Sequence, residues 1–319
     1  MPEKVLVTRE IPEAGLKPLE DFDVTVLSEA PPERDELLEG ARGAEGVLST
    51  VTEKIDGEFM DAAGEGLKVV ANLAVGYDNV DVEAANERGV IVTNTPGVLD
   101  EATADVAFAL ILATSRRLIE ADRFVRTGEP WIWGPLSFLG LDLSAGATLG
   151  VVGLGRIGLA VARRAHAFRM RIIATGGRTD SPQARELGVT AVDLDELLAT
   201  SDVVSLHCPL TPATRHLIGA AELARMKDTA ILVNTARGPV VDERALIDAL
   251  HGGVIAGAGL DVYEHEPEIP PELRKLDNVV LLPHIASAGA ATREAMALLA
   301  VDNVAAVLAG RPPLTPVGR

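Results

Sequence analysis

The segment TLGVVGLGRIG, residues 148–158, joins a short apolar run to three glycines spaced as G-x-G-x-x-G. A helix-like stretch follows, and a second apolar run, residues 171–175, completes a strand–helix–strand unit. In such a unit the first glycine makes the tight turn, the second lets a phosphate approach the backbone, and the third lets helix and strand pack closely. The helix N-terminus offers free N–H groups to the anion. The segment therefore predicts a dinucleotide-binding turn, with a glycine turn that binds nothing as the alternative.

Similar apolar runs recur on both sides of this turn, separated by helix-like segments. The first series is Val5–Val7, Val24–Leu27, Gly46–Ser49, Val69–Asn72 and Val90–Thr93. The second is Ala147–Val152, Arg171–Thr175, Val203–Leu206, Ala230–Asn234, Gly257–Asp261 and Val279–Leu282. Alternating strands and helices are typical of parallel sheets covered by helices on both faces. We therefore expect an α/β protein with two doubly wound parallel-sheet domains.

The composition limits the partners and the compartment. The chain has 319 residues, a formal net charge of −18, 47% hydrophobic residues and 24% charged residues. This balance is typical of a globular protein, and the acidic charge disfavours binding to nucleic acid or to anionic membranes, so we expect neither partner. The single cysteine, Cys208, cannot form a disulfide within the chain. Residues 1–8 carry an early acid and only a short apolar run, unlike a secretory signal, so we expect a cytoplasmic location.

The region between the two series contains a helix-like segment and an irregular one. Residues 101–126 carry apolar side chains at helical spacing without glycine or proline, which predicts one long helix. Residues 128–135 follow, rich in glycine and proline and holding both tryptophans, Trp131 and Trp133. This segment is either a surface loop with tucked aromatic side chains or an arm exchanged with a partner subunit.

The end of the second strand of the unit bears on the choice of cofactor. NAD-binding folds place an acidic residue about 20 residues after the first glycine, where it binds the ribose hydroxyls. No acid occupies residues 174–179, and Arg178 with Thr179 can hold a 2′-phosphate instead. We therefore expect NADP(H) as the preferred cofactor, with NAD(H) as the alternative. The predicted contacts are Gly153, Leu154, Gly155, Arg156, Ile157, Gly158, Gly176, Gly177, Arg178 and Thr179.

Three further strand ends carry reactive side chains: Arg237, Glu266 and His284. Ligands of open α/β sheets bind outside the carboxyl ends of the strands, so these three groups indicate one catalytic site. Taken singly, Arg237 can be an ordinary salt-bridge residue, Glu266 a solvated acid and His284 a buried histidine.

At this point the chain resembles the D-isomer-specific 2-hydroxyacid dehydrogenases over essentially its whole length. The matching stretches are residues 153–158, 234–238, 260–267 and 282–284. Within the family the likeness is greatest to glyoxylate and hydroxypyruvate reductases, on residues 72–79, 93–97, 102–105, 133–135 and 138–140. Gly176-Gly177-Arg178 departs from the Ser-Arg-Thr-like run that NADP-dependent relatives more often carry, so we expect the 2′-phosphate contact to be displaced or weakened.

The resemblance implies reduction of a small 2-oxoacid to the D-2-hydroxyacid by hydride transfer from NAD(P)H. It implies that Arg237 holds the substrate carboxylate, a bidentate task suited to guanidinium. His284 would be the general acid and Glu266 would pair with its other ring nitrogen. The N–H groups of Val75 and Gly76 would add donors to the substrate. Further cofactor contacts would be Thr103, His207, Pro209, Thr235, Ala236 and Asp261.

The resemblance also implies the organisation of the domains and their assembly. A Rossmann-type cofactor domain, residues 99–286, would be inserted into a flavodoxin-like substrate-binding domain of residues 1–98 and 287–319. The family is typically dimeric through the cofactor domain, so we expect a homodimer. We expect no metal, because His207 and Cys208 have no second cysteine or histidine at ligand spacing.

Two alternative functions remain open from the sequence. The first is a phosphoglycerate or other D-2-hydroxyacid dehydrogenase. Many phosphoglycerate dehydrogenases carry an appended regulatory domain, and we expect none after the last helix of this chain. A formate dehydrogenase is disfavoured, because that branch carries glutamine in place of Glu266. The second alternative is a dinucleotide-sensing corepressor-like binding protein, which can retain the same three side chains.

Overall fold

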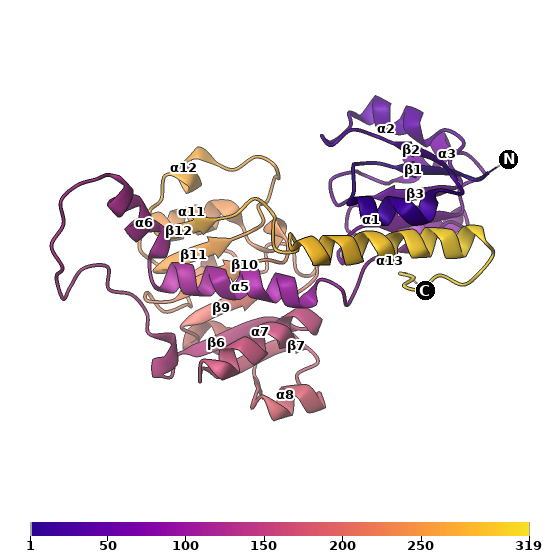
Figure 1. Ribbon diagram of the computed structural model, residues 1–319. Helices are drawn as coiled ribbons and strands as arrows, with labels where there is room; N and C mark the ends of the chain where they lie inside the picture. Colours follow the sequence, from indigo (N-terminus) through magenta and orange to yellow (C-terminus); the bar gives the residue numbers. More distant parts are fainter. Residues whose placement is uncertain (1, 319) are drawn as a thin grey trace. The chain divides into compact units, whose positions relative to one another are not determined.

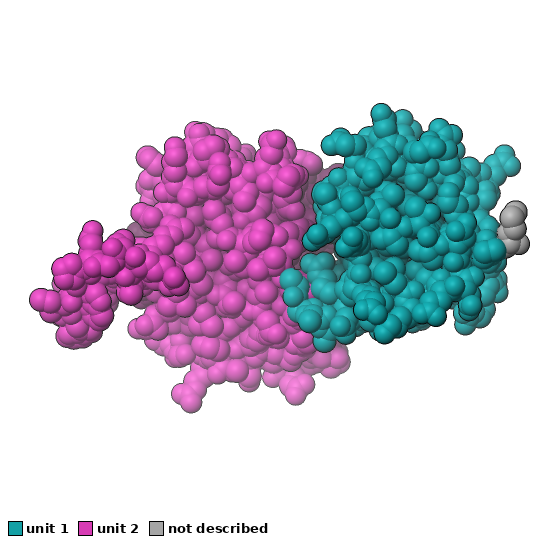
Figure 2. Space-filling view, turned by 45° about the horizontal axis from the view of Figure 1, so that its top comes forward, with its two compact units in different colours: residues 1–99, 288–319 teal, residues 100–287 magenta. Residues whose placement is uncertain are grey.

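The protein, described here by a computed structural model of residues 2–318, forms two compact units (Figures 1 and 2). Unit 1 combines the residues up to Leu99 with those from Ala288 onward, and unit 2 is Asp100–Ser287. Each unit holds one parallel sheet with helices on it, which confirms the predicted α/β class. None of the described helices combines the length and hydropathy that a membrane-spanning segment requires.

Unit 1 has five strands in the order β2-β1-β3-β4-β5, which is the flavodoxin order. The strands are β1 (Lys4–Val7), β2 (Asp23–Val26), β3 (Gly46–Ser49), β4 (Val69–Asn72) and β5 (Ile91–Thr93). The helices are α1 (Glu13–Leu16), η1 (Lys17–Leu19), α2 (Arg34–Ala41), α3 (Gly57–Ala63), α4 (Val82–Glu87) and α13 (Ala290–Leu308). Two aspartates set helix starts: Asp56 accepts the N–H of Phe59 at 3.1 Å, and Asp81 accepts that of Ala84 at 2.9 Å.

Unit 2 has seven strands in the order β12-β11-β10-β9-β6-β7-β8, the doubly wound arrangement with its reversal between β6 and β9. The strands are β6 (Thr148–Leu154), β7 (Arg171–Gly177), β8 (Thr190–Ala191), β9 (Val203–Leu206), β10 (Ile231–Asn234), β11 (Gly257–Leu260) and β12 (Val279–Leu281). The helices are α5 (Asp100–Ser115), α6 (Leu118–Arg126), η2 (Leu143–Ala145), α7 (Arg156–Ala167), α8 (Pro182–Glu186), α9 (Leu194–Thr200), α10 (Ala220–Leu223), η3 (Gly238–Val240), α11 (Glu243–His251) and α12 (Pro271–Arg274).

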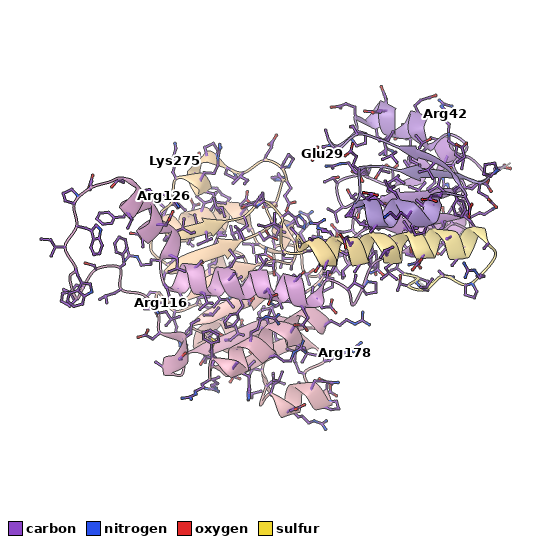
Figure 3. All side chains as sticks on the ribbon, viewed as in Figure 1. Glu29, Arg42, Arg116, Arg126, Arg178 and Lys275 are labelled. Atoms are coloured by element: carbon purple, nitrogen blue, oxygen red, sulfur yellow. The ribbon has the colours of Figure 1, made fainter. Side chains whose placement is uncertain are left out.

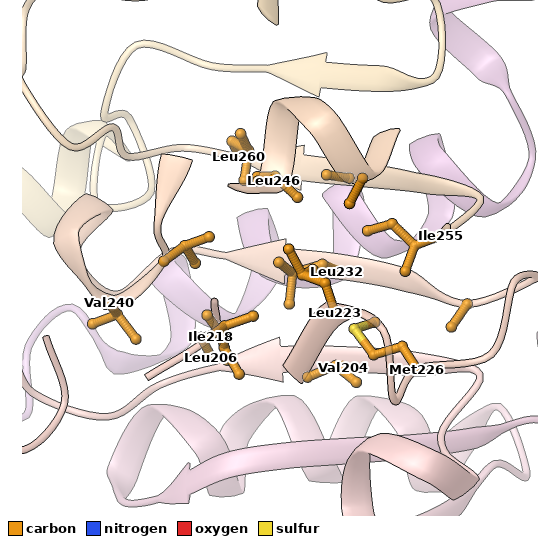
Figure 4. Packing of buried hydrophobic residues seen from close by; sticks show 14 of the residues in the cluster. Val204, Leu206, Ile218, Leu223, Met226, Leu232, Val240, Leu246, Ile255 and Leu260 are labelled. Atoms are coloured by element: carbon orange, nitrogen blue, oxygen red, sulfur yellow. The ribbon is translucent and has the colours of Figure 1, made fainter. Parts of the chain in front are cut away.

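The sheet of unit 2 is buried on both faces, as parallel sheets are. Alternate residues of β10 belong to different apolar clusters, because successive strand side chains point to opposite faces. Leu232 packs with Val204 on one face (Figure 4). Ile231 and Val233 pack on the other face, which α5 and α7 cover. The strands β9, β10 and β11 are therefore fully buried, and their packing holds the strand ends in fixed register.

The predicted helix over 101–126 is wrong in one respect, because it is broken between α5 and α6. Arg117 adopts a left-handed conformation, with φ of +52°. The chain returns at Leu141, whose N–H donates to the carbonyl of Ser115 at 2.8 Å. A Cβ at Gly140 would lie 2.2 Å from that carbonyl, so only glycine allows this approach. The break therefore comes from a tertiary contact that the helical pattern does not contain.

The segment between α6 and β6 holds half of the large exposed apolar side chains of unit 2. We call residues 127–142 the arm; Figure 1 shows it as a long purple loop, and it forms the projecting end of unit 2 in Figure 2. The exposed fractions are 61% for Trp131, 94% for Ile132, 76% for Trp133 and 80% for Leu136. Both tryptophans are thus exposed in the single chain, and the surface loop with tucked aromatic side chains is not what the structure shows.

Candidate active site

The three glycines of the turn between β6 and α7 have different surroundings. Gly153 has φ of +92°, and a Cβ there would lie 2.7 Å from the backbone nitrogen of Cys208. A Cβ at Gly158 would lie 2.5 Å from the carbonyl oxygen of Gly153. At Gly155 a Cβ would meet nothing within 4 Å. Packing thus demands the outer glycines, whereas open space in front of Gly155, beside the free N–H groups of α7, fits a phosphate.

The chain after β7 borders this turn. A Cβ at Gly177, where φ is +78°, would lie 2.7 Å from the backbone of Leu154, and the N–H of Arg178 donates to the Leu154 carbonyl at 2.9 Å. The Arg178 side chain is exposed (Figure 3) and has no hydrogen-bond or ion-pair partner within residues 2–318. Gly176 is exposed and Thr179 half-buried. An unpaired guanidinium therefore lies one residue beyond the strand that ends beside the turn.

Other arginines of the same region are already paired. Arg163 and Arg164 on α7 both form ion pairs with Glu101 on α5, and Arg164 also pairs with Asp105. Arg156, at the start of α7, is exposed, and Ile157 beside it is half-buried. Of the exposed arginines in this region that form no ion pair, Arg156 and Arg178 are the two that border the glycine turn.

The remaining predicted cofactor contacts of unit 2 lie on α5 and in the segments that follow the strands β9, β10 and β11. The Nε2 of His207 lies 2.8 Å from the Oγ of Ser205, and burial lowers the pKa of His207 to about 4, so the ring is neutral near pH 7. Pro209 is exposed and Ala236 half-buried. Thr103 and Thr235 are both buried, and the Thr235 hydroxyl has no hydrogen-bond partner among the described residues. A buried hydroxyl without a partner at a strand end is a fitting contact for a bound molecule.

The turn after β10 presents Arg237. The side chain of Asn234 accepts the N–H of Ala236 at 3.0 Å and donates to the carbonyl of Arg237 at 2.9 Å, which fixes the turn. A Cβ at Gly238 would lie 1.8 Å from the carbonyl oxygen of Tyr263. The turn that carries Arg237 is therefore packed backbone to backbone on the segment after β11, which carries Glu266.

His284 and Glu266 form a direct pair. The Nδ1 of His284 lies 2.8 Å from one carboxylate oxygen of Glu266, and the N–H of Tyr263 donates to the other at 3.0 Å. Partial burial acts to raise the pKa of Glu266, but the hydrogen bond and charge of His284, with the charge of Arg237, outweigh it and lower the pKa. An ionised carboxylate only accepts, so Nδ1 carries a hydrogen and Nε2 is the nitrogen left for another partner.

Two residues that the sequence did not single out for this purpose hold the pair in place. Asp261 is fully buried, and its carboxylate accepts the N–H groups of Ile285 at 2.7 Å and Ala286 at 2.8 Å. Burial raises the pKa of Asp261 in spite of these bonds. His284 itself has φ of +56°, and its N–H donates to the Asp261 carbonyl at 2.9 Å. Asp261 thus fixes the strained backbone around the histidine, a role that depends on contacts between distant segments.

Tyr263 links the same segments a second time. Its hydroxyl, on a buried ring, donates to the carbonyl of Leu282 at 2.8 Å, next to the turn of His284. The residue therefore contacts Glu266 through its N–H and the end of β12 through its side chain. The sequence places Tyr263 in a stretch that resembles the family but carries no pattern for this contact.

Val75 and Gly76 belong to unit 1, in the loop after β4. Both residues are half-buried, and their N–H groups donate no hydrogen bond within residues 2–318. Each is therefore available to an acceptor from outside the protein.

A cavity lies at the amino ends of the strands in the sheet of unit 2. It measures about 680 Å³ and is lined by parts of α5, α6, the arm and the amino ends of β10 and β12. Because all seven strands are parallel, this edge is the one remote from Arg237, Glu266 and His284. Among the described residues no group of three or more histidine, cysteine or acidic side chains is placed to hold a metal ion.

Comparison with known sequences gives a consistent result. Residues 108–286 match the profile of the D-isomer specific 2-hydroxyacid dehydrogenase NAD binding domain. A glyoxylate reductase of Thermococcus onnurineus is 54% identical over 327 residues, covering 100% of this chain and 97% of that protein.

Comparison with solved structures agrees. The TT0316 protein of Thermus thermophilus superposes with a TM-score of 0.92 at 50% identity, over 99% of this chain and all of that one. An NADPH-dependent glyoxylate/hydroxypyruvate reductase of Sinorhizobium meliloti, in complex with NADP and malonate, gives 0.85 at 38% identity, over 100% and 97%.

Proposed function

The chain belongs to the D-isomer specific 2-hydroxyacid dehydrogenase family, and we propose that glyoxylate and hydroxypyruvate are its substrates. Its reaction class is the NAD(P)H-dependent reduction of a 2-oxoacid. The observation that carries the proposal is the bond between His284 and Glu266, with Arg237 on the adjoining turn. The relatives named as glyoxylate reductases support the choice of substrates.

In the proposed mechanism His284 supplies the proton and Arg237 binds the substrate. The bound nicotinamide supplies the hydride that reduces the 2-oxo carbon. His284 donates the Nε2 proton to the carbonyl oxygen, so that the C=O becomes a hydroxyl, and the proton is regained from solvent. Glu266 stays ionised and orients the ring through Nδ1. Arg237 holds the substrate carboxylate by two parallel hydrogen bonds and draws electron density from the carbonyl.

We assign the cofactor to unit 2, and to unit 1 two further donors to the substrate. Unit 1, the predicted substrate domain of residues 1–98 and 287–319, contributes the N–H groups of Val75 and Gly76. Unit 2, the predicted domain of residues 99–286, binds the cofactor. The open space at Gly155 and the unpartnered hydroxyl of Thr235 support a fit to a dinucleotide. His207, Pro209, Thr103, Ala236 and Asp261 remain predicted contacts on the same unit.

The proposed cofactor preference is NADPH over NADH, because Arg178 is unpaired and no acid occupies residues 174–179. Arg178→Ser is expected to raise the KM for NADPH about tenfold and to leave the KM for NADH unchanged, since only NADPH carries the 2′-phosphate. Arg185→Ser, at another exposed arginine on α8, is the control. Equal effects on both cofactors would show that Arg178 does not contact the 2′-phosphate.

The substrate proposal is tested by initial rates with glyoxylate, hydroxypyruvate and pyruvate, each with NADPH and with NADH. We expect the highest kcat/KM with glyoxylate or hydroxypyruvate and NADPH. A clear preference for pyruvate would reassign the substrate within the family. No turnover of any 2-oxoacid would favour a dinucleotide-binding protein without this activity.

The proposed assembly is a homodimer in which the arm contacts a second copy. Large exposed apolar side chains gathered in one segment mark an interaction site, and Leu139 of the arm also lines the cavity of about 680 Å³. Ile132→Ser combined with Trp133→Ser is expected to convert dimer to monomer in sedimentation velocity. Leu314→Ser, at an exposed leucine of unit 1, is the control. A wild-type monomer would contradict the proposal.

A further inference from the structure

The loop after β4, residues 73–79, has three successive carbonyl groups that are each bound from within unit 1. The carbonyl of Ala74 accepts the N–H of Thr95 at 2.8 Å. The carbonyl of Val75 accepts the Nδ2 of Asn94 at 2.8 Å, and that of Gly76 accepts the Nδ2 of Asn72 at 2.9 Å. All three donors follow or end the neighbouring strands β4 and β5, so the three carbonyls are drawn toward these strand ends.

The planarity of the peptide bond carries this arrangement over to the N–H groups. In a trans peptide the carbonyl and the N–H of the next residue point in opposite directions. The only cis peptide of the described chain is Glu266–Pro267, outside this loop. The N–H groups of Val75, Gly76 and Tyr77 therefore point away from the ends of β4 and β5. None of these three N–H groups donates a hydrogen bond within residues 2–318. Tyr77 is exposed, and Val75 and Gly76 are half-buried.

The orientation of Asn72 is fixed by its other partners. The side chain is fully buried, and its Oδ1 accepts from the hydroxyl of Ser49 at 3.0 Å. Its Nδ2 also lies 3.1 Å from the Oδ1 of Asn79, whose own Nδ2 donates to the carbonyl of Thr50 at 2.8 Å. A hydroxyl and a second amide thus determine which end of Asn72 faces Gly76.

Asn94 is held from the C-terminal segment. Its N–H donates to the carbonyl of Thr315 at 3.2 Å, and its carbonyl accepts the Thr315 hydroxyl at 2.6 Å. Asn303, buried on α13, accepts the N–H of Thr315 at 3.0 Å and donates to its hydroxyl at 2.9 Å. A continuous set of hydrogen bonds therefore runs from α13 through Asn94 to the carbonyl of Val75.

We propose that Asn72 and Asn94 are positioning residues that aim three consecutive N–H groups, including that of Tyr77, at the carboxylate of the substrate. Successive backbone N–H groups that point the same way form an anion site without a charged side chain. The inference rests on the proposed function, because it takes the anion to be a short 2-oxoacid. An amide suits the task, since a carboxylate at either position would repel the carbonyl and the substrate alike.

The test begins with Asn94→Leu, which keeps the side-chain volume and removes the donor to Val75. Without that bond the N–H of Gly76, which belongs to the same peptide, would no longer be aimed at the charged carboxylate. We expect the KM for glyoxylate to rise roughly 10- to 100-fold, as for a lost hydrogen bond to a charged group, with a smaller change in kcat. The Kd for NADPH should stay within about twofold, because unit 2 is unaltered. Leu37→Ala, in the core of unit 1 away from this loop, controls for lowered stability and should leave the KM unchanged.

Asn94→Ser is a second, less disruptive variant for use if the leucine variant does not fold. The direct readout is the set of backbone amide resonances of Val75, Gly76 and Tyr77 in the NADPH-bound enzyme titrated with oxalate, an unreactive dicarboxylate. All three should shift in the wild type, and less in the Asn94 variants at the same oxalate concentration.

The outcomes separate this inference from the proposed function. Wild-type turnover with an unchanged KM in both Asn94 variants would overturn the positioning role and leave the function intact. A silent Tyr77 resonance beside shifting Val75 and Gly76 would remove the third donor. Oxalate shifts at all three amides without turnover of any 2-oxoacid would support the anion site and overturn the function.

Discussion

The cluster of Arg237, Glu266 and His284 in unit 2 and the 73–79 loop in unit 1 both follow the carboxyl ends of parallel strands, but they differ in chemistry. The cluster consists of ionisable side chains, two of which, His284 and Glu266, form a pair at 2.8 Å. The groups of the loop that we assign to the substrate are neutral N–H groups, and the carbonyl of each of these peptides accepts a hydrogen bond within unit 1. In the proposed reaction the first region moves a proton, and the second only binds.

The difference locates the pH dependence of the enzyme. Groups that transfer protons must titrate, whereas peptide N–H groups and asparagine amides do not. Loss of a side chain in the cluster should therefore change kcat and the pH profile. Loss of a side chain behind the loop should change KM at every pH alike.

The largest effect is expected for His284→Ala. Removing a positioned general acid should lower kcat by about 10²- to 10⁴-fold, because the carbonyl oxygen must then take its proton from water. Fluorescence titration should show unchanged NADPH affinity. His251→Ala, at an exposed histidine on α11, should have full activity. A loss of less than about tenfold would assign the proton to another group.

Arg237→Ala should have the next largest effect, on both parameters. We expect KM for glyoxylate to rise about 10- to 100-fold and kcat to fall with it, because the guanidinium both binds the carboxylate and polarises the carbonyl. The control is Arg244→Ala, at an exposed arginine paired with Asp248 at 2.9 Å. If KM stayed unchanged, Arg237 would not contact the substrate.

A smaller effect is expected on stability for Glu266→Gln. The folded-state pKa of Glu266 lies below its ordinary value, so ionised Glu266 stabilises the fold above that ordinary value. This stabilisation is lost as the pH falls through the folded-state pKa. The difference in Tm between the wild type and Glu266→Gln should therefore be greatest near neutral pH and should vanish in acid. Glu268→Gln, at an exposed neighbour, should show no such trend.

The smallest effect is expected for the pH dependence of the KM of Asn94→Leu relative to the wild type. The ratio of the KM of Asn94→Leu to that of the wild type should stay within about twofold across the pH range in which histidines titrate, because neither the loop N–H groups nor Asn94 ionise. The measurement is a pair of pH profiles with glyoxylate. A ratio that follows the titration of one group would mean that the loop is coupled to the charged cluster.

The glycine turn was predictable from the sequence, and the asparagine-supported loop was not. Gly158 is required by its contact with the Gly153 carbonyl, and Gly153 by its positive φ, so the glycine spacing of this one turn is visible in a short window. Asn72 and Asn94 act through residues from β3 to the C-terminal segment. Val75 and Gly76 were expected as donors only through the family resemblance, and Tyr77 was not expected.

The same distinction explains the differences in the fold. Fully buried strands such as β9 and β10 follow directly from their apolar runs. The two-residue strand β8 has no such run, because it is an exposed edge that pairs with β7 alone. The break at Arg117 depends on Leu141, whose N–H binds the helix end from a distant part of the chain. Local patterns predict local structure, and contacts between distant segments decide the rest.

The most direct test of the central claim is the isotopic and chiral composition of one product. The wild-type enzyme is incubated with hydroxypyruvate and with NADPH that carries deuterium at the transferable position of the nicotinamide. The account predicts D-glycerate with one deuterium at C2, identified by chiral chromatography and mass spectrometry. Glycerate of the L form, glycerate without deuterium, or no glycerate at all would contradict it.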